Sequence, residues 1–212
     1  MLRAISATGE IDRFLDLGCG SGILSAAILD RFPDAVGTLV DFSEPMLNAA
    51  QAHLSTNKDQ IEFIHADLAS PGWLDGVPGN EPFNAVVSGY AIHHLTDARK
   101  KQLFLEIHEH LSAGGIFINV EHVSSSTPWV ESLFEQTFVN SLHDRERNRG
   151  GARTKEDLGK EYYHREDKNA NILAPVEIQC QWLREIGYKD VDCYFKLFEL
   201  AVFGGRRTRA EN

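Results

Sequence analysis

The chain has few cysteines, three among its 212 residues, and their positions argue against two common uses of thiols. Cys19, Cys180 and Cys193 show none of the short spacings that hold a metal ion, and their odd number favours reduced thiols over a disulfide framework. No catalytic Cys-His or Ser-His-Asp arrangement and no metal-ligand spacing occurs either. We therefore expect no bound metal, and a fold stabilised by burial of a hydrophobic core.

Long apolar runs are also missing, since none approaches the roughly 20 residues that a membrane-spanning helix needs. The start of the chain lacks the pattern of a secretory signal peptide. Hydrophobic residues make up 42% and charged residues 25% of the chain, as is usual for globular proteins. The expectation is a single domain over residues 1–212, a cytoplasmic monomer or homodimer with no membrane partner.

Basic residues are scarce as well, because 21 Lys and Arg stand against 31 Asp and Glu, giving a net charge of −10. The deficit lies almost entirely within residues 1–123, so the first three-fifths of the chain is strongly acidic. A surface of this charge repels a phosphate polymer. The sequence therefore predicts a small-molecule partner and no nucleic acid.

Glycine, in contrast, is concentrated in one informative run, Asp16-Leu17-Gly18-Cys19-Gly20-Ser21-Gly22. It follows a short apolar stretch and precedes a helix-like segment, and its glycines let the backbone turn tightly and approach a ligand. The dinucleotide fingerprint has two residues between its second and third glycines, whereas this run has one. Asp41 ends the next strand-like run, which is the layout of a βαβ unit with an acid placed for a ribose.

Strand-like and helix-like segments alternate along most of the chain. Strands are expected at 13–17, 35–41, 61–66, 83–88, 116–123, 188–195 and 198–203, and helices at 22–32, 43–55, 97–111 and 175–187. The alternation predicts an α/β protein with a Rossmann-like, doubly wound, seven-stranded and mostly parallel sheet. The last two strands are so close in sequence that they must form a hairpin, which places an antiparallel strand at the C-terminal end.

Residues 124–173 interrupt this alternation and are more polar. Two helical pieces are expected there, over 127–142 and from Thr154 toward Tyr163. We expect this segment to be a helical lid insertion after the fifth strand, packed over the sheet edge.

Four elements follow successive expected strands: the glycine run, Asp41, Asp67 and the run 88–95. In this order and at these spacings, from residue 13 to about 205, the chain resembles class I S-adenosylmethionine-dependent methyltransferases of the small-molecule type. The segment 111–117 and the closing helix and hairpin fit the same family. The resemblance implies in-line transfer of a methyl group from S-adenosylmethionine, leaving S-adenosylhomocysteine, to an O, N, C or S nucleophile.

The resemblance also implies which residues bind the cofactor. They are Asp16, Gly18, Gly20, Gly22, Asp41, Phe42, Met46, Asp67, Leu68, Ser88, Gly89 and Tyr90. The two oxygens of Asp41 suit both ribose hydroxyls, and Asp16 suits the ammonium group of the ligand. Asp67 suits the exocyclic amine of adenine. The alternatives are an N-cap-like or solvated strand end for Asp41, a helix cap for Asp67, and core positions for Phe42 and Met46.

Candidates for a general base are less defined by the sequence. Glu121 and His122 end the fifth expected strand and are the catalytic candidates. His93 and His94 occupy positions that commonly hold packing histidines in the resembling family. The substrate-side candidates are His93, Tyr162, Tyr163 and Arg165, of which the last three form a cluster that lines a substrate pocket or is a solvated helix face.

Three other functions stay open. A nicotinamide-dependent oxidoreductase on a related sheet is disfavoured by the glycine spacing, and a non-catalytic cofactor-binding protein is the second alternative. Methylation of RNA or protein is the third, but the Asn/Asp-Pro-Pro-aromatic run of such enzymes is replaced here by Ser88-Gly89-Tyr90-Ala91. Family members usually carry more N-terminal helix than the dozen or so residues before the first strand, so the chain either lacks part of it or closes its site with 124–173.

Overall fold

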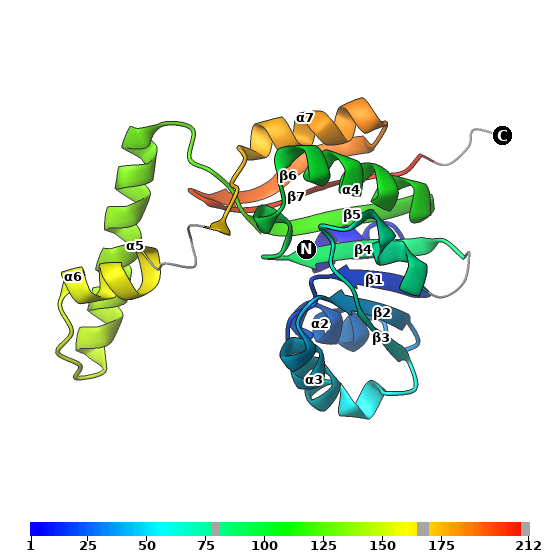
Figure 1. Ribbon diagram of the computed structural model, residues 1–212, viewed down its shortest axis with the longest axis horizontal. Helices are drawn as coiled ribbons and strands as arrows, with labels where there is room; N and C mark the ends of the chain where they lie inside the picture. The colour runs from blue at the N-terminus through cyan, green and yellow to red at the C-terminus, as the bar shows by residue number, and fades with distance from the viewer. Residues whose placement is uncertain (78–80, 165–169, 209–212) are drawn as a thin grey trace.

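The structure, a computed structural model, describes residues 1–77, 81–164 and 170–208. The described residues form one sheet in the order β3-β2-β1-β4-β5-β7-β6 (Figure 1). Its strands are β1 (Arg13–Leu17), β2 (Val36–Asp41), β3 (Ile61–His65), β4 (Phe83–Gly89), β5 (Leu111–His122), β6 (Lys189–Leu197) and β7 (Leu200–Arg206). The first five are parallel, and β7 runs antiparallel to both β5 and β6. The predicted doubly wound sheet with its closing hairpin is confirmed.

Helices cover both faces of this sheet. They are α1 (Leu2–Ser6), α2 (Ile23–Arg31), α3 (Glu44–His53), α4 (Asp97–His110) and α7 (Val176–Ile186), with short turns η1 (Ser55–Asn57), η2 (Pro71–Gly76) and η3 (Ile92–His94). Alternate residues of the strands supply the two cores, as the period of two requires. Leu15 and Leu17 belong to the core under α4 and α7, whereas Phe14 belongs to the core under α1 and α2.

The start of β5 differs from the expectation. The strand begins at Leu111, not at residue 116, because Phe83 pairs with Leu111 and Ala85 pairs with Ile116. Three residues of β4 thus span six residues of β5, and the extra residues of β5 form an irregularity inside the strand. Gly114 and Gly115, expected to end the preceding helix, lie within it. A Cβ on Gly115 would lie 3.0 Å from the carbonyl oxygen of Phe83, so the close approach of β4 favours glycine at this position.

The start of α3 is also built differently from the expectation. Ser43 is its N-cap residue, but its side chain accepts no capping hydrogen bond. Instead the backbone N–H of Ser43 donates to Oδ1 of Asp41 at 2.9 Å. The turn from β2 into α3 is therefore held by the acid that ends the strand.

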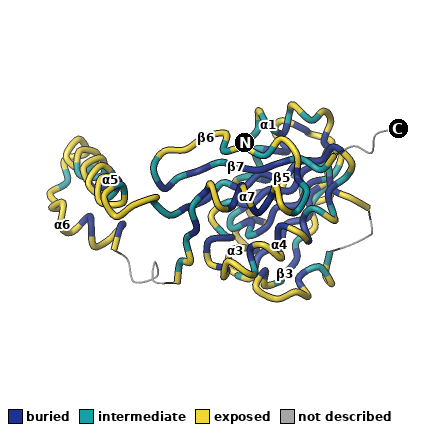
Figure 2. The backbone as a smooth tube through the Cα atoms, turned by 90° about the horizontal axis from the view of Figure 1, so that it is seen from above, coloured by how far each residue is buried: buried dark blue, intermediate teal, exposed yellow. Residues whose placement is uncertain are grey.

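The insertion after β5 forms an arm, residues 128–164, that extends away from the sheet (Figure 1). It contains α5 (Pro128–Asn148), α6 (Lys155–Leu158) and the π-helical turn η4 (Gly159–Tyr163). Two helical pieces were expected, but packed over the sheet edge; instead the arm projects beyond the ends of β5 and β7, and its helices are mostly exposed (Figure 2). Its small core, Phe134, Val139 and Tyr163, meets the body of the protein at Phe198 and Leu200 of the β6–β7 hairpin.

Candidate functional site

The glycine loop joins β1 to α2 and is tied to the end of β2. The N–H groups of Gly18 and Cys19 both donate to the carbonyl oxygen of Val40, at 2.8 and 3.0 Å. Gly18, Gly20 and Gly22 all have positive φ, a backbone conformation that residues with a Cβ rarely adopt. A Cβ on Gly20 would meet no atom within 4 Å, so the loop presents bare backbone to open space at this position.

Asp41 links this loop to the turn after β2. Its Oδ2 accepts from the N–H of Gly20 at 2.8 Å, and the carboxylate is 6% exposed. Each oxygen therefore has one backbone partner and a second lone pair available. Phe42 and Met46 beside it are 69% and 47% exposed, so neither belongs to the core, which removes the core alternative for both.

Asp16 lies beneath the loop, fully buried on the α2 side of the sheet. Its Oδ2 accepts from the hydroxyl of Ser25 at 2.6 Å, whereas its Oδ1 is buried without a hydrogen-bond partner in the part of the chain that the structure describes. Burial raises the pKa of Asp16 to about 7, and nearby Asp41 adds to the rise. A buried, unpaired carboxylate oxygen is costly, so this position suits a cationic or hydrogen-bonding group of a ligand.

The remaining positions assigned to the cofactor divide into exposed and buried ones. Asp67 is exposed, and its Oδ1 accepts from the N–H of Ala69 at 2.8 Å, while Leu68 is buried. Ser88 is fully buried, and its hydroxyl donates to the carbonyl oxygen of Leu17 at 2.7 Å. The Ser88 side chain therefore joins β4 to β1, which leaves only its backbone for a ligand.

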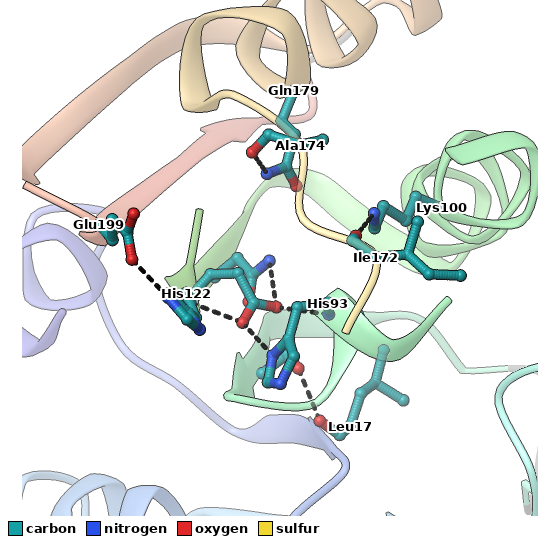
Figure 3. Close-up of polar contacts among 11 residues, drawn as sticks. Leu17, His93, Lys100, His122, Ile172, Ala174, Gln179 and Glu199 are labelled. Carbon is teal, nitrogen blue, oxygen red and sulfur yellow. Dashed lines mark hydrogen bonds and ion pairs between the residues drawn. The ribbon is translucent and has the colours of Figure 1, made fainter. Parts of the chain in front are cut away.

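His93 follows β4 and is held by Glu121 of β5 (Figure 3). Nδ1 of His93 lies 2.6 Å from Oε1 of Glu121, and the N–H of His93 donates to Oε2 at 3.0 Å. The N–H of His122 also donates to Glu121, which is only 1% exposed. Glu121 therefore fixes the orientation of the His93 ring and leaves Nε2 as the nitrogen that it does not hold.

His122, the other catalytic candidate, has a separate carboxylate partner. Its Nε2 lies 3.0 Å from Oε2 of Glu199, at the β6–β7 turn (Figure 3). Ser125 donates its hydroxyl to the other oxygen of Glu199 at 2.8 Å. The turn is thereby fastened to the end of β5, where the arm begins.

A cavity of about 420 Å³ lies between the body and the arm. It is lined by Tyr90, His93, His94, His122, Phe134, Phe138, Tyr162, Tyr163, Asn171 and Leu200. The predicted candidates Tyr90, His93, His122, Tyr162 and Tyr163 are thus brought together. Glu121 does not line this cavity, and Arg165 lies outside the described residues.

A second cavity of about 410 Å³ adjoins the first, since His122, Tyr163 and Asn171 line both. It carries Glu131, Glu135 and Glu199. Burial is the main cause that raises the pKa of Tyr163, and these three carboxylates raise it further. The phenol of Tyr163 is therefore held in its neutral form.

Four lining residues had not been singled out: Phe134, Phe138, Asn171 and Leu200. The spacing of the two phenylalanines predicts an apolar helix face and no more. That this face meets Leu200, about 60 residues away, follows from tertiary packing, for which the sequence holds no local signal.

The ring-lined cavity and the glycine loop are neighbours. A Cβ on Gly18 would lie 2.1 Å from Cβ of Ala91, which stands between Tyr90 and His93 in the chain. The loop and the cavity therefore meet at the carboxyl ends of β1 and β4, where ligands of open α/β sheets bind. The described residues contain no cluster of three or more His, Cys, Asp and Glu suited to a metal ion. Among them, no helix has the length and hydropathy to cross a membrane.

Comparisons with known proteins agree with this geometry. The family described as "Methyltransferase domain" matches residues 14–115. An uncharacterized methyltransferase of Mycobacterium tuberculosis (strain ATCC 25618 / H37Rv) is 39% identical over 85 residues, 40% of this chain and 39% of that protein. A ribosomal RNA small subunit methyltransferase C of Pseudomonas entomophila (strain L48) is 34% identical over 103 residues, 48% of this chain and 29% of that protein.

Among solved structures, an O-methyltransferase family protein from Burkholderia thailandensis matches with a TM-score of 0.69 at 16% identity, covering 100% of this chain and 56% of that chain. The chain thus spans about half of that protein and matches two fifths or less of these curated relatives. The shared architecture is the Rossmann-like methyltransferase fold. Residues 14–115 therefore match a methyltransferase domain, and the chain has the fold of the class I S-adenosylmethionine-dependent methyltransferases.

Proposed function

We propose that this chain transfers a methyl group from S-adenosylmethionine to a small-molecule acceptor, with His93 as the base that takes the proton of the acceptor. The observation that carries the proposal is the pairing of His93 with buried Glu121 at a cavity that adjoins the glycine loop. Glu121 is then a positioning residue: it holds one ring nitrogen and stabilises the imidazolium that forms. His122 serves as a cavity-lining residue.

The glycine loop and the acids around it are the proposed cofactor site. Bound S-adenosylmethionine supplies a methyl group on a positively charged sulfur. Gly20 offers open space for close approach, the free lone pairs of Asp41 accept from the ribose hydroxyls, and Oδ1 of Asp16 gains the partner it lacks. Exposed Phe42 and Met46 flank the adenine, with Asp67 and the Leu68 backbone at its edge. The backbone of Ser88, Gly89 and Tyr90 lies toward the methionine part.

An RNA acceptor is the competing possibility, since one relative is a ribosomal RNA methyltransferase. That match leaves most of the relative unaligned, so its name does not extend to this acceptor site. The acidic balance of the chain and the size of the cavity, a partly open hollow of only about 420 Å³, favour a small molecule.

Calorimetry with S-adenosylhomocysteine, followed by a screen of small molecules for its release from S-adenosylmethionine, tests the proposal. With a turned-over acceptor, we expect His93→Gln to lower kcat by about 100-fold or more and to leave the Kd of S-adenosylhomocysteine unchanged. His143→Gln, on the outer part of α5, is the matched control and should leave kcat unchanged.

Four results contradict the proposal. They are stabilisation by NADH without binding of S-adenosylhomocysteine, cofactor binding with no turnover of any acceptor, methylation of RNA alone, and an unchanged kcat in His93→Gln. The first two point to the oxidoreductase and to the non-catalytic binding protein.

A further inference from the structure

The lining of the acceptor cavity consists mainly of rings, contributed by the body and by the arm. Tyr90, His93 and His122 stand on the body side, and Phe134 and Phe138 stand on α5. We infer that the acceptor is a planar aromatic compound whose reacting group is a hydroxyl on the ring, an inference that rests on the proposed function. It goes beyond that function by naming the chemical class of the substrate.

The geometry of the rings supports a flat occupant. Phe134 and Phe138 are 5.9 Å apart between centroids, so α5 presents an aromatic wall to the cavity, and Phe198 of the hairpin packs 5.5 Å from Phe134. Tyr90 lines the same cavity from the end of β4, where it is 52% exposed and held at a φ of 54° with its N–H bonded to Val120. Aromatic ligands pack favourably in an offset or edge-to-face manner against such walls.

The cavity also suits a ligand of this class in size and polarity. Its volume of about 420 Å³ lies within the range of small-molecule sites, and eight of its ten lining residues carry a ring. His93 places its ring at the body side of this cavity with one nitrogen already held by Glu121. The hydroxyl of an aromatic ligand would thus lie near His93 while its ring contacts Phe134 and Phe138 of the arm.

The chemistry of the base points to the same class. A phenolic hydroxyl has an ordinary pKa of about 10, whereas the pKa of a hydroxyl without such delocalisation is far higher and closer to that of water. Imidazole is a weak base, so it assists the ionisation of the first far better than that of the second. Glu121 holds Nδ1 of His93, which leaves Nε2 to receive the proton of the ring hydroxyl.

The step balances as follows. A lone pair of the ring hydroxyl forms the bond to the methyl carbon while the carbon–sulfur bond of S-adenosylmethionine breaks. The bonding pair stays on sulfur, which becomes the neutral thioether of S-adenosylhomocysteine, and the hydroxyl proton moves to Nε2 of His93. The products are the aryl methyl ether, S-adenosylhomocysteine and protonated His93, so the total charge is conserved.

A matched pair of probes tests the inference: 1-naphthol, and decahydro-1-naphthol, which has the same carbon skeleton without aromatic rings. Binding of each to the complex with S-adenosylhomocysteine is measured by calorimetry, and methylation from S-adenosylmethionine by release of S-adenosylhomocysteine. We expect 1-naphthol to bind and to be methylated with a kcat/KM at least 100-fold above that of the saturated alcohol. Catechol and 2-naphthol extend the aromatic side of the panel.

Variants of the aromatic wall separate ring stacking from general apolarity. Phe138, partly exposed on α5, is changed to Tyr and to Leu, and Leu105→Ala on α4 is the control. We expect Phe138→Leu to raise the KM for 1-naphthol about 10-fold, Phe138→Tyr to keep it within about two-fold, and neither to change the Kd of S-adenosylhomocysteine.

Two outcomes of the probe experiment overturn the inference: preferential methylation of saturated alcohols or aliphatic amines, and failure of every aromatic hydroxyl both to bind and to react. Loss of cofactor binding contradicts the proposed function instead, because the cofactor is measured separately from the acceptor. Equal effects of Phe138→Leu and Leu105→Ala would remove the wall from the argument and overturn the inference as well.

Discussion

Asp16 has the least compensated environment of the residues at the glycine loop. Burial raises its pKa from 3.8 to about 7, so the folded protein keeps a proton that the unfolded chain loses near pH 4. The stability that this proton contributes is fully present below pH 4 and is lost as the pH rises to about 7. Asp16→Asn cannot ionise and keeps an oxygen that accepts from Ser25.

We therefore expect the free energy of unfolding of Asp16→Asn, relative to the wild type, to rise by roughly 2–4 kcal/mol between pH 4 and pH 8. Urea denaturation at several pH values measures this difference. Any constant penalty for the new amide cancels in the comparison. A difference that does not change with pH would show that Asp16 is ionised throughout.

Asp41 differs from Asp16 because both of its oxygens already hold backbone N–H groups. In Asp41→Ala the ribose acceptors and the tie to Gly20 are lost together. We expect the affinity for S-adenosylhomocysteine to fall by about 1.5–3 kcal/mol, the size of lost charge-assisted hydrogen bonds. Calorimetry measures it, with Asp30→Ala on the exposed side of α2 as the control. Equal affinities of Asp41→Ala and the wild type would reject this role.

The sequence predicts these two acids because each stands at the end of a strand, a position that local patterns reveal. It does not predict what Glu121 and His93 do. Their contact spans 28 residues and requires β4 and β5 to pair in the observed register. The sequence therefore offers Glu121 and its neighbour His122 as catalytic candidates together, whereas in the fold Glu121 holds the ring of His93 and His122 contacts Glu199.

At the scale of elements, the arm depends on local hydrogen bonds, such as helix caps, more than the sheet does. Helix α6 begins with a capping box, in which Thr154 Oγ1 accepts from the N–H of Asp157 at 3.1 Å and Asp157 Oδ2 accepts from the N–H of Thr154 at 3.1 Å. In the body, Thr96 caps α4 through the N–H of Arg99. The two caps share their chemistry, but only α4 also packs on a large core.

We expect Thr154→Ala to destabilise the arm locally by about 1 kcal/mol, which is roughly a five-fold faster amide exchange over 155–163. Hydrogen exchange followed by mass spectrometry measures this. Thr96→Ala should leave the exchange of 155–163 at the wild-type rate. Equal acceleration by both variants would mean that the arm opens only with the whole fold.

At the scale of the whole molecule, the order of strands and helices was predictable because each carries its own period and end signals. The start of β5 was not predictable. Gly114 and Gly115 suggest that the strand begins after them, but pairing with β4 continues through an irregularity back to Leu111. The direction of the arm was not predictable either. Its position follows from contacts with Phe198 and Leu200, which lie far away in the sequence.

The joint between arm and body therefore sets how the molecule responds to its ligands. The arm meets the body at a small cluster, so it should open at a lower cost in free energy than the sheet.

We expect trypsin to cut first within 124–173. S-adenosylhomocysteine alone, whose proposed site lies on the body, should leave this rate nearly unchanged. Adding 1-naphthol should slow it several-fold, because a ligand that contacts Tyr90 and Phe138 together stabilises the closed joint. A first cut in the sheet, or equal protection by S-adenosylhomocysteine alone, would contradict this division between cofactor and acceptor sites.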